Sequence, residues 1–195
     1  MRPGLTLFFV RHGETDWNAA HRLQGQIDVP LNDTGRTQAA RNGRVLKKLI
    51  GSLDAVDFVA SPLARARETM EIIRAELGLA PDDFRVEGRL KEINFGHWEG
   101  HYWSELPALD AAGYADREAN PFHWRPSGGE SYADLARRTL AWLRDVDRDT
   151  VVVSHGGVSR TLRGHILKLD PREVPFLKVP QDRVLRLRSE GIEWL

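Results

Sequence analysis

The chain has 195 residues, of which 28 are basic, 28 are acidic and none is cysteine. The balanced charge gives no bulk electrostatic reason to expect binding to nucleic acid or to an anionic membrane, and the lack of cysteine excludes disulfides, thiolate catalysis and thiolate zinc sites. The length suits a single domain spanning 1–195, and no apolar run approaches the ~18 residues of a membrane span, so we expect a cytoplasmic protein.

The first predicted element is a strand. Leu5–Val10 is a continuous apolar run, which is typical of a strand covered on both faces. A helix is predicted next, over 34–50, because Thr34 can cap its first turn and Gly51 can end it.

A second strand and helix follow in the same order. Asp57–Ala60 predicts a short strand, and Ser61-Pro62 then opens a helix that extends to about Leu77. Proline suits the first helical position, and Gly78 suits the position after the end. Phe84–Val86 predicts a further short strand.

Residues 94–129 differ from the rest of the chain in composition. They hold three of the six tryptophans together with several glycines and prolines. We interpret this stretch as a partly irregular, lid-like excursion with a short helix.

The C-terminal third returns to alternating elements. The patterns predict a helix over 130–146, a buried strand at Thr150–Val153, a helix ending near Leu169, and a hairpin formed by 183–188 and 192–195. Alternating strands and helices predict an α/β fold with a mostly parallel central sheet between two helical layers, an α/β/α sandwich.

Several polar residues follow the predicted strands. In open α/β sheets, ligands bind beyond the carboxyl ends of the strands. Arg11 and His12 follow the first strand, Arg65 lies one helical turn after the second, and His155 and Gly156 follow the late strand. Two of these ends open helices, whose free N–H groups attract anions. The pattern therefore predicts a phosphate site.

The residue types suit phosphoryl transfer. A neutral imidazole is a good nucleophile, which makes His12 the candidate acceptor of the phosphoryl group. Arg11 and Arg65 would neutralise the phosphate and hold it with forked donors, and His155 would donate to the transferring oxygens. Gly156 would let the backbone approach the ligand closely.

A leaving alkoxide also needs a proton. Glu92 follows a strand-like stretch and is the candidate acid, since the charge of a nearby phosphate favours its protonated form. The rival carboxylates are Glu14, Glu99 and Glu105.

The motifs together resemble the histidine phosphatase superfamily, which includes the cofactor-dependent phosphoglycerate mutases. Five ordered blocks carry the resemblance: Arg11-His12-Gly13-Glu14-Thr15 with Trp17-Asn18; Gln24-Gly25 with Asp28, Pro30-Leu31 and Gly35; Ser61-Pro62-Leu63-Ala64-Arg65-Ala66 with Thr69; Glu92 with Phe95-Gly96 and Trp98-Glu99-Gly100; and Gly129-Glu130-Ser131 followed by Ser154-His155-Gly156-Gly157.

The resemblance implies a phosphoglycerate mutase-like fold, no metal and no other cofactor. It implies a phosphohistidine at His12, a phosphate pocket with Arg11, Arg65 and His155, and a proton donor at Glu92. It further implies that Asn18 contacts the phosphate and that the Gln24-Gly25 turn meets the substrate.

The substrate is expected to be a small phosphate ester, with the chain closer to the small-molecule phosphatases than to the true mutases. Family mutases have a longer insertion between the acid and the second histidine, with paired arginines and a lysine, whereas only 62 residues separate Glu92 from His155 here. Arg125, together with Arg117 or nearby histidines, could still supply a second anion clamp. The alternatives are a 2,3-bisphosphoglycerate-dependent mutase, a phosphoprotein phosphatase, and a non-catalytic binding protein.

The remaining polar and aromatic residues have simpler interpretations. One or two of the aromatic residues in 94–129 should contact substrate; the candidates are Trp98, Tyr102, Trp103 and Trp124, with Trp98 and Tyr102 preferred. The Arg137-Arg138 pair is predicted to lie on an exposed helix face, and Arg67 to be a surface arginine. His97, His101 and His123 are predicted to be solvated and not to form a metal site. The protein is expected to be a monomer or a homodimer.

Overall fold

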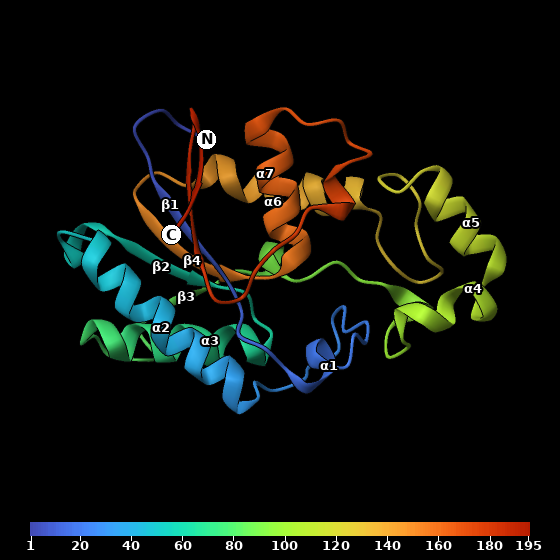
Figure 1. The fold of residues 1–195 in the computed structure, drawn as a ribbon. Coiled ribbons are helices and arrows are strands. Elements are labelled where there is room, and N and C mark those ends of the chain that lie inside the picture. The colour runs from blue at the N-terminus through green and yellow to red at the C-terminus, as the bar shows by residue number, and fades with distance from the viewer.

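The structure is a computed structural model that describes residues 1–195. Its centre is a single sheet of six strands in the order β3-β2-β4-β1-β5-β6 (Figure 1). The strands are β1 (Leu7–Arg11), β2 (Asp57–Ala60), β3 (Arg85–Val86), β4 (Thr150–Ser154), β5 (Val184–Arg188) and β6 (Gly191–Trp194). Strands β3, β2, β4 and β1 run parallel, and the hairpin β5–β6 joins β1 antiparallel. The predicted α/β fold with a mostly parallel sheet is confirmed.

Helices cover both faces of the sheet (Figure 1). The α-helices are α1 (Asp16–Ala19), α2 (Asp33–Leu49), α3 (Ala64–Leu77), α4 (Leu106–Leu109), α5 (Ala111–Ala119), α6 (Tyr132–Asp145) and α7 (Gly156–Leu167). The pair α2 and α3 covers one face, the pair α6 and α7 covers the other, and α4 and α5 lie beside the sandwich (Figure 1). None of these helices has both the length and the apolar character required to cross a bilayer.

Strand β1 shows why this sheet needs helices on both faces. Leu7 and Phe9 pack with side chains of α6 and α7, whereas Phe8 and Val10 pack with side chains of α2 and α3. Successive residues of a strand point to opposite faces, so a strand without polar alternation must be covered twice. Each such buried side chain stabilises the fold by roughly 1.5–3 kcal/mol relative to its exposed state.

The start of α2 differs from the prediction. Asn32, not Thr34, is the N-cap: its side-chain oxygen accepts from the Gly35 N–H at 2.8 Å. Asn32 also donates its backbone N–H to the carbonyl of Glu14, so the loop after β1 selects this residue over a capping residue two positions later.

The start of α3 also differs. The helix begins at Ala64, and Pro62 lies before it and not at its first position. The N–H of Ala64 donates to the Asp28 carboxylate at 2.8 Å, so a residue from a distant loop caps the helix. Gly78 ends the helix in the left-handed conformation, at φ +80°, as the sequence predicts.

The 94–129 segment contains two short helices, α4 and α5, where one was predicted. It has a small apolar cluster of its own, in which Trp98 and Leu106 of the segment pack with Leu23. The segment is therefore held partly by its own packing and not only by contact with the sandwich.

Candidate active site

The parallel strands bring the two predicted catalytic histidines together. His12 follows β1 and His155 follows β4, the neighbouring strand, and the His12 N–H donates to the carbonyl of Ser154 at 2.9 Å. The imidazole ring centroids are 5.1 Å apart, and both side chains are buried. Residues separated by more than 140 positions in the chain thus share one edge of the sheet.

The surroundings of His12 keep its imidazole neutral. Its Nδ1 lies 2.8 Å from the carbonyl oxygen of Gly13, which can only accept, so Nδ1 carries the ring proton and Nε2 keeps its lone pair. Burial, followed by the charges of Arg65 and Arg11, holds the pKa of His12 well below its usual value. The ring is therefore neutral at neutral pH, with its single N–H at Nδ1.

His155 contacts a buried hydroxyl. Its Nε2 lies 2.6 Å from Ser61 Oγ, and its Nδ1 is buried without a partner in the protein. When the Ser61 hydroxyl donates to Nε2, Nδ1 carries the proton and can donate to a phosphoryl oxygen. Burial, followed by the nearby Arg65 charge, also lowers the pKa of His155 well below its usual value.

Two predicted arginines are held beside the histidines by backbone carbonyls. Arg11 donates from Nη1 to the carbonyl of Val179 at 2.8 Å. Arg65 donates to the carbonyls of Ile27 at 2.8 Å and Gly25 at 2.7 Å. The Nε of each guanidinium is buried without a partner, and neither group forms a salt bridge. Both cations are therefore positioned and free to bind an anion.

Burial affects the two arginines and distinguishes them from Arg67. Desolvation, followed by the charge of Arg160, lowers the pKa of Arg11 to about 10, and desolvation also lowers the pKa of Arg65. Both remain charged at neutral pH. Arg65 is 1% exposed, whereas Arg67 lies on the exposed face of the same helix, as predicted.

Glu92 is held at the N-terminus of α7. Its Oε1 accepts from the N–H of Gly157 at 3.0 Å and from that of Ile93 at 2.9 Å. A Cβ on Gly157 would lie 2.4 Å from Oε1, so only glycine permits this approach. The carboxylate lines the same cavity as His12.

The rival carboxylates have other partners. Glu99 accepts from the backbone N–H groups of Gln26 and Phe95, and Glu105 accepts from that of Tyr102. Glu14 accepts from the side chain of Asn32 and lines an adjoining hollow. Glu92 is the one acidic residue that lines the cavity at His12.

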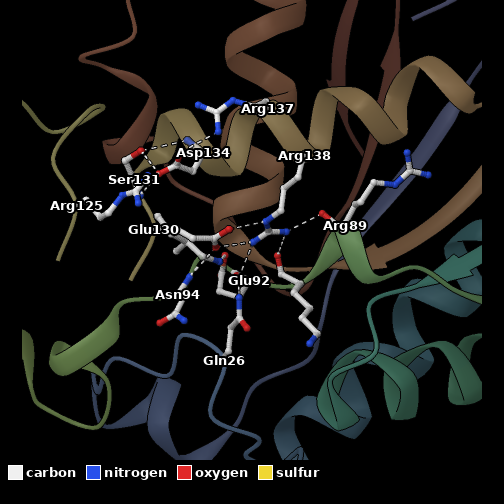
Figure 2. Close-up of polar contacts among 12 residues, drawn as sticks. Gln26, Arg89, Glu92, Asn94, Arg125, Glu130, Ser131, Asp134, Arg137 and Arg138 are labelled. Atoms are coloured by element: carbon white, nitrogen blue, oxygen red, sulfur yellow. Dashed lines mark hydrogen bonds and ion pairs between the residues drawn. The ribbon is translucent and has the colours of Figure 1, made fainter. Parts of the chain in front are cut away.

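Arg138 fixes the backbone around Glu92, which corrects the prediction that it lies on an exposed helix face (Figure 2). Its guanidinium donates to the carbonyls of Arg89 and Lys91 at 2.7 Å and of Glu92 at 2.9 Å, and it forms a two-pronged ion pair with Glu130. Only the neighbouring Arg137 is exposed, as predicted, and it pairs with Asp134.

Glu130 extends this network along the same segment. Its carboxylate accepts from the N–H of Asn94 at 3.0 Å, and its own N–H donates to the Asn94 carbonyl at 2.8 Å. Gln26 donates from the other side to the Glu92 carbonyl at 3.0 Å (Figure 2). Hydrogen bonds therefore hold the backbone on both sides of Glu92 in place.

The cavity at His12 has a volume of about 150 Å³. Asn18, which was predicted to contact the phosphate, and Gln24 and Gly25, which were predicted to contact the substrate, line this cavity. The Asn18 carbonyl oxygen accepts from Thr15 and Gln181, which leaves its amide N–H groups available to a ligand. The Gln24 side-chain oxygen is buried without a partner.

Gly156 is placed among the polar groups of the cavity. It begins α7, and a Cβ on it would lie 3.5 Å from Arg160 Nη1 and 3.8 Å from both Arg11 Nε and Glu92 Oε2. The absence of a side chain leaves that space open between the two cations and the acid; the approach of the backbone to a ligand stays a prediction.

Of the four aromatic residues predicted as substrate contacts, the two preferred ones do not line the cavity. Trp98 is fully buried, donates from Nε1 to Asp110 at 3.0 Å and packs against the ring of Trp124, away from the cavity lining. Tyr102 is 40% exposed and does not line the cavity. Trp103, another of the four candidates, lines it together with Phe95, which was not among them. The composition identified 94–129 as the segment that carries the aromatic residues, but only its fold determines which ring faces the cavity.

The sequence analysis missed two arginines of the cavity, Arg22 and Arg160. Arg160 lies four residues after Gly156 on α7, so both occupy one face of the helix near its start. This spacing is the same signal that selected Arg65 and could have identified Arg160. Arg22 has no comparable signal, because an isolated β-bridge with Tyr102 places it.

The predicted lid histidines have separate surroundings. His97 is partly exposed and contacts Asp110 at 3.0 Å, and His101 lies 3.7 Å from Glu105. His123 is exposed. No group of three or more His, Asp or Glu side chains in the structure is arranged to hold a metal ion; metal independence of the activity stays a prediction.

Known proteins share both the sequence pattern and the fold. The chain is 34% identical over 184 residues to glucosyl-3-phosphoglycerate phosphatase of Mycobacterium tuberculosis, covering 88% of this chain and 79% of that one. It is 35% identical over 162 residues to a metal-independent phosphoserine phosphatase of Arabidopsis thaliana, covering 80% and 66%. A 2,3-bisphosphoglycerate-dependent phosphoglycerate mutase of Mycobacterium leprae also matches, at 30% identity over 93% of this chain and 85% of the mutase.

The three-dimensional comparison agrees with the sequence comparison. A solved structure of mycobacterial glucosyl-3-phosphoglycerate phosphatase in complex with VO3 superimposes with a TM-score of 0.81 at 32% identity, covering 98% of this chain and 97% of that one. The family model for branch 1 of the histidine phosphatase superfamily matches residues 7–195. Because this match includes nearly the whole chain, the protein belongs to branch 1 of the histidine phosphatase superfamily.

Proposed function

We propose that the protein hydrolyses small-molecule phosphate monoesters through a phosphohistidine at His12, without a metal ion. The observation that carries the proposal is the neutral His12, with Nε2 free and two unpaired arginines beside it. A nucleophile of this kind next to preorganised cations suits attack on phosphorus. The relatives named as phosphatases act on small phosphate esters, which supports the same reaction here.

In the first step, Arg11 and Arg65 hold the phosphoryl oxygens while His12 Nε2 attacks phosphorus. The N–P bond forms as the bond from phosphorus to the ester oxygen breaks, and Glu92 gives its proton to the departing alkoxide. The N–H groups of His155 and Asn18 donate to the phosphoryl oxygens as charge spreads over them.

In the second step, water replaces the alcohol in the cavity. The Glu92 carboxylate takes a proton from this water as its oxygen attacks phosphorus, and the N–P bond breaks. His12 recovers its lone pair, Glu92 recovers its proton, and inorganic phosphate leaves. The guanidinium groups supply the positive charge that a divalent cation supplies in metal-dependent phosphatases.

The two arginines that the sequence offered as a second anion clamp for a mutase, Arg125 and Arg117, lie outside the cavity at His12. Arg125 forms an ion pair with Asp134, outside the cavity. Arg117 pairs with Glu118 and stacks on the rings of Trp103 and Phe176. Neither arginine lines the cavity at His12, so neither supplies the second anion clamp that a retained bisphosphate intermediate requires.

The test measures turnover and the covalent intermediate together. Wild type should hydrolyse p-nitrophenyl phosphate in excess EDTA, be inhibited by vanadate, and carry an acid-labile, base-stable phosphoryl label. His12→Ala should lose both turnover and label, whereas His123→Ala, at an exposed position, should keep both. Residual activity of His12→Ala above a few per cent, or loss of wild-type activity in EDTA that zinc or magnesium restores, would overturn the proposal.

A second assay separates phosphatase from mutase. With 3-phosphoglycerate, phosphate release should exceed formation of 2-phosphoglycerate, with or without 2,3-bisphosphoglycerate. Isomerisation that depends on the bisphosphate and greatly outpaces phosphate release would favour the mutase alternative.

A further inference from the structure

The cavity at His12 contains more positive charge than one phosphate ester can neutralise. Four guanidinium groups line it, those of Arg11, Arg22, Arg65 and Arg160, against the single carboxylate of Glu92. Both catalytic histidines are neutral because burial lowers each pKa. A phosphate monoester contributes about −1.5 to −2 charge at neutral pH. Since Glu92 must be protonated to act as the acid, roughly two positive charges stay unmatched.

Arg160 is fixed close to the phosphate-binding groups. Its Nε donates to the carbonyl of Leu177 at 2.8 Å and its Nη1 lies 3.2 Å from the hydroxyl of Tyr132. Arg160 Nη1 and Arg11 Nε lie 3.5 and 3.8 Å from one point, the position of a Cβ on Gly156. The carboxylate at this point is that of Glu92, whose Oε2 lies 3.8 Å from it, and neither arginine forms a salt bridge. Once Glu92 is protonated, the two like charges are stabilised when an anion enters between them.

Arg22 lies in the loop after α1, whereas Arg160 lies on α7, and Arg22 is held by different contacts. Its guanidinium carbon lies 4.3 Å from the ring centroid of Trp17 and 5.5 Å from that of Tyr102, and its Nε donates to the carbonyl of Gly100. These contacts use the planar faces and one N–H of the group, which leaves the terminal N–H donors for a ligand. Like Arg160, it has no carboxylate partner.

We propose that Arg160 and Arg22 form a second anion subsite and that the preferred substrate carries, besides its phosphate ester, a second anionic group. This inference rests on the proposed phosphatase function and narrows it to a substrate class. The second group is a carboxylate or a second phosphate, since both accept forked hydrogen bonds from arginine. The 150 Å³ cavity favours a compact substrate in which the two anions are a few bonds apart.

The experiment compares substrates that differ in one group. 3-Phosphoglycerate and glycerol 3-phosphate differ by a carboxylate, and fructose 1,6-bisphosphate and fructose 6-phosphate differ by a phosphate. For wild type, we expect kcat/KM to be roughly 10-fold to 100-fold higher for the member with the second anionic group in at least one pair, the usual range for hydrogen bonds to a charged group. The pair that shows the difference identifies the second group.

Variants then locate the subsite. Arg160→Gln and Arg22→Gln should each reduce that ratio several-fold, and Arg160→Lys should restore part of it because it keeps the charge. Arg163→Gln is the matched control, since Arg163 lies one turn further along α7 and donates to the carbonyl of Lys178 outside the cavity. Its ratio should equal that of wild type.

The outcomes separate this inference from the proposed function. If wild type fails to hydrolyse even p-nitrophenyl phosphate, the proposed function itself is wrong. If wild type hydrolyses p-nitrophenyl phosphate but treats both members of each pair equally, only the second subsite is wrong. The subsite is also refuted if the ratio is high in wild type but unchanged in Arg160→Gln and Arg22→Gln, each shown by circular dichroism to be folded.

Discussion

The edge of the sheet and the 94–129 segment both contribute to the cavity, but they hold their side chains in different ways. At the sheet edge, His12, His155 and Arg65 are buried, and hydrogen bonds of neighbouring parallel strands determine their spacing. The segment consists of short helices and turns that pack on their own small cluster around Trp98. The sheet edge is therefore suited to hold the groups that act on the phosphate in a fixed geometry. The segment is suited to vary which substrate fits the cavity.

Glu92 lies at the junction of these two regions. Its backbone precedes the 94–129 segment, but its carboxylate is bound by the first turn of α7 at the sheet edge. Figure 2 shows Arg138 of α6 in contact with this backbone, where its guanidinium donates to the Glu92 carbonyl. The comparison therefore predicts that substitutions at Glu92 or Arg138 impair proton donation to the leaving group more than they impair phosphate binding.

The largest expected effect is that of Glu92→Gln on substrates with a basic leaving group. Loss of the proton donor should slow hydrolysis of alkyl phosphates by roughly 10²–10⁴-fold, the usual contribution of general acid catalysis. p-Nitrophenyl phosphate should be slowed much less, because nitrophenolate leaves without a proton. Steady-state kinetics on both substrates measures the difference. Equal losses would transfer the role to another carboxylate, with Glu14 the first candidate.

A smaller effect is expected for Arg138→Met. Without the guanidinium, the carbonyls of residues 89, 91 and 92 lose their donor and Glu92 moves from its position. A displacement of about 1 Å can slow an enzyme by up to about 10²-fold. If Arg138 acts through Glu92, the loss should be greater on alkyl phosphates than on p-nitrophenyl phosphate.

Two controls distinguish positioning from general destabilisation. Arg137→Met changes the exposed neighbour and should leave both substrates unaffected. In a Glu92→Gln background, Arg138→Met should add little further loss, since the acid is already absent. Additive losses in the double variant, or identical losses on the two substrates, would show that Arg138 only stabilises the fold.

The smallest effect concerns stability against acid and sharpens the contrast between the regions. The pKa values of His12 and His155 are lowered by burial, so below about pH 6.5 the unfolded chain binds protons that the folded chain excludes. Stability should therefore fall with decreasing pH, by up to roughly 1.4 kcal/mol per pH unit for each histidine.

Urea unfolding between pH 7.5 and 5.0 measures this dependence. His12→Asn should show a shallower decrease than wild type, because one excluded proton is gone. His123→Gln, in the exposed part of the 94–129 segment, should follow the wild-type curve. A wild-type slope in His12→Asn would mean that His12 accepts its proton in the folded state.

Local patterns determined the elements and the residues at the sheet edge. The apolar run of β1, the short strand Asp57–Ala60 and the residues that follow them predicted the sheet and placed His12, Arg65 and His155 at one edge. These predictions were possible because parallel strands end at the same side of a sheet, so position along each strand is sufficient to bring distant residues together.

Tertiary contacts decided which residues cap the helices and which aromatic side chains are buried, because these features depend on segments that are distant in the sequence. Asn32 rather than Thr34 caps α2 because the backbone of Glu14 binds it, and Asp28 caps α3 from another loop. Trp98 is buried and Trp103 faces the cavity, although both are tryptophans of the same short segment.

Arg137 and Arg138 show the same limit most directly. The two are adjacent and identical in type, so neither composition nor charge distinguishes them, and helical spacing shows only that they point in different directions. The side of α6 that bears Arg138 faces the carbonyls of residues 89, 91 and 92, and Arg138 donates to all three. Arg137 points away from them and stays at the surface. A buried carbonyl without a donor is costly, and the chain's own folding determines where such a carbonyl is found.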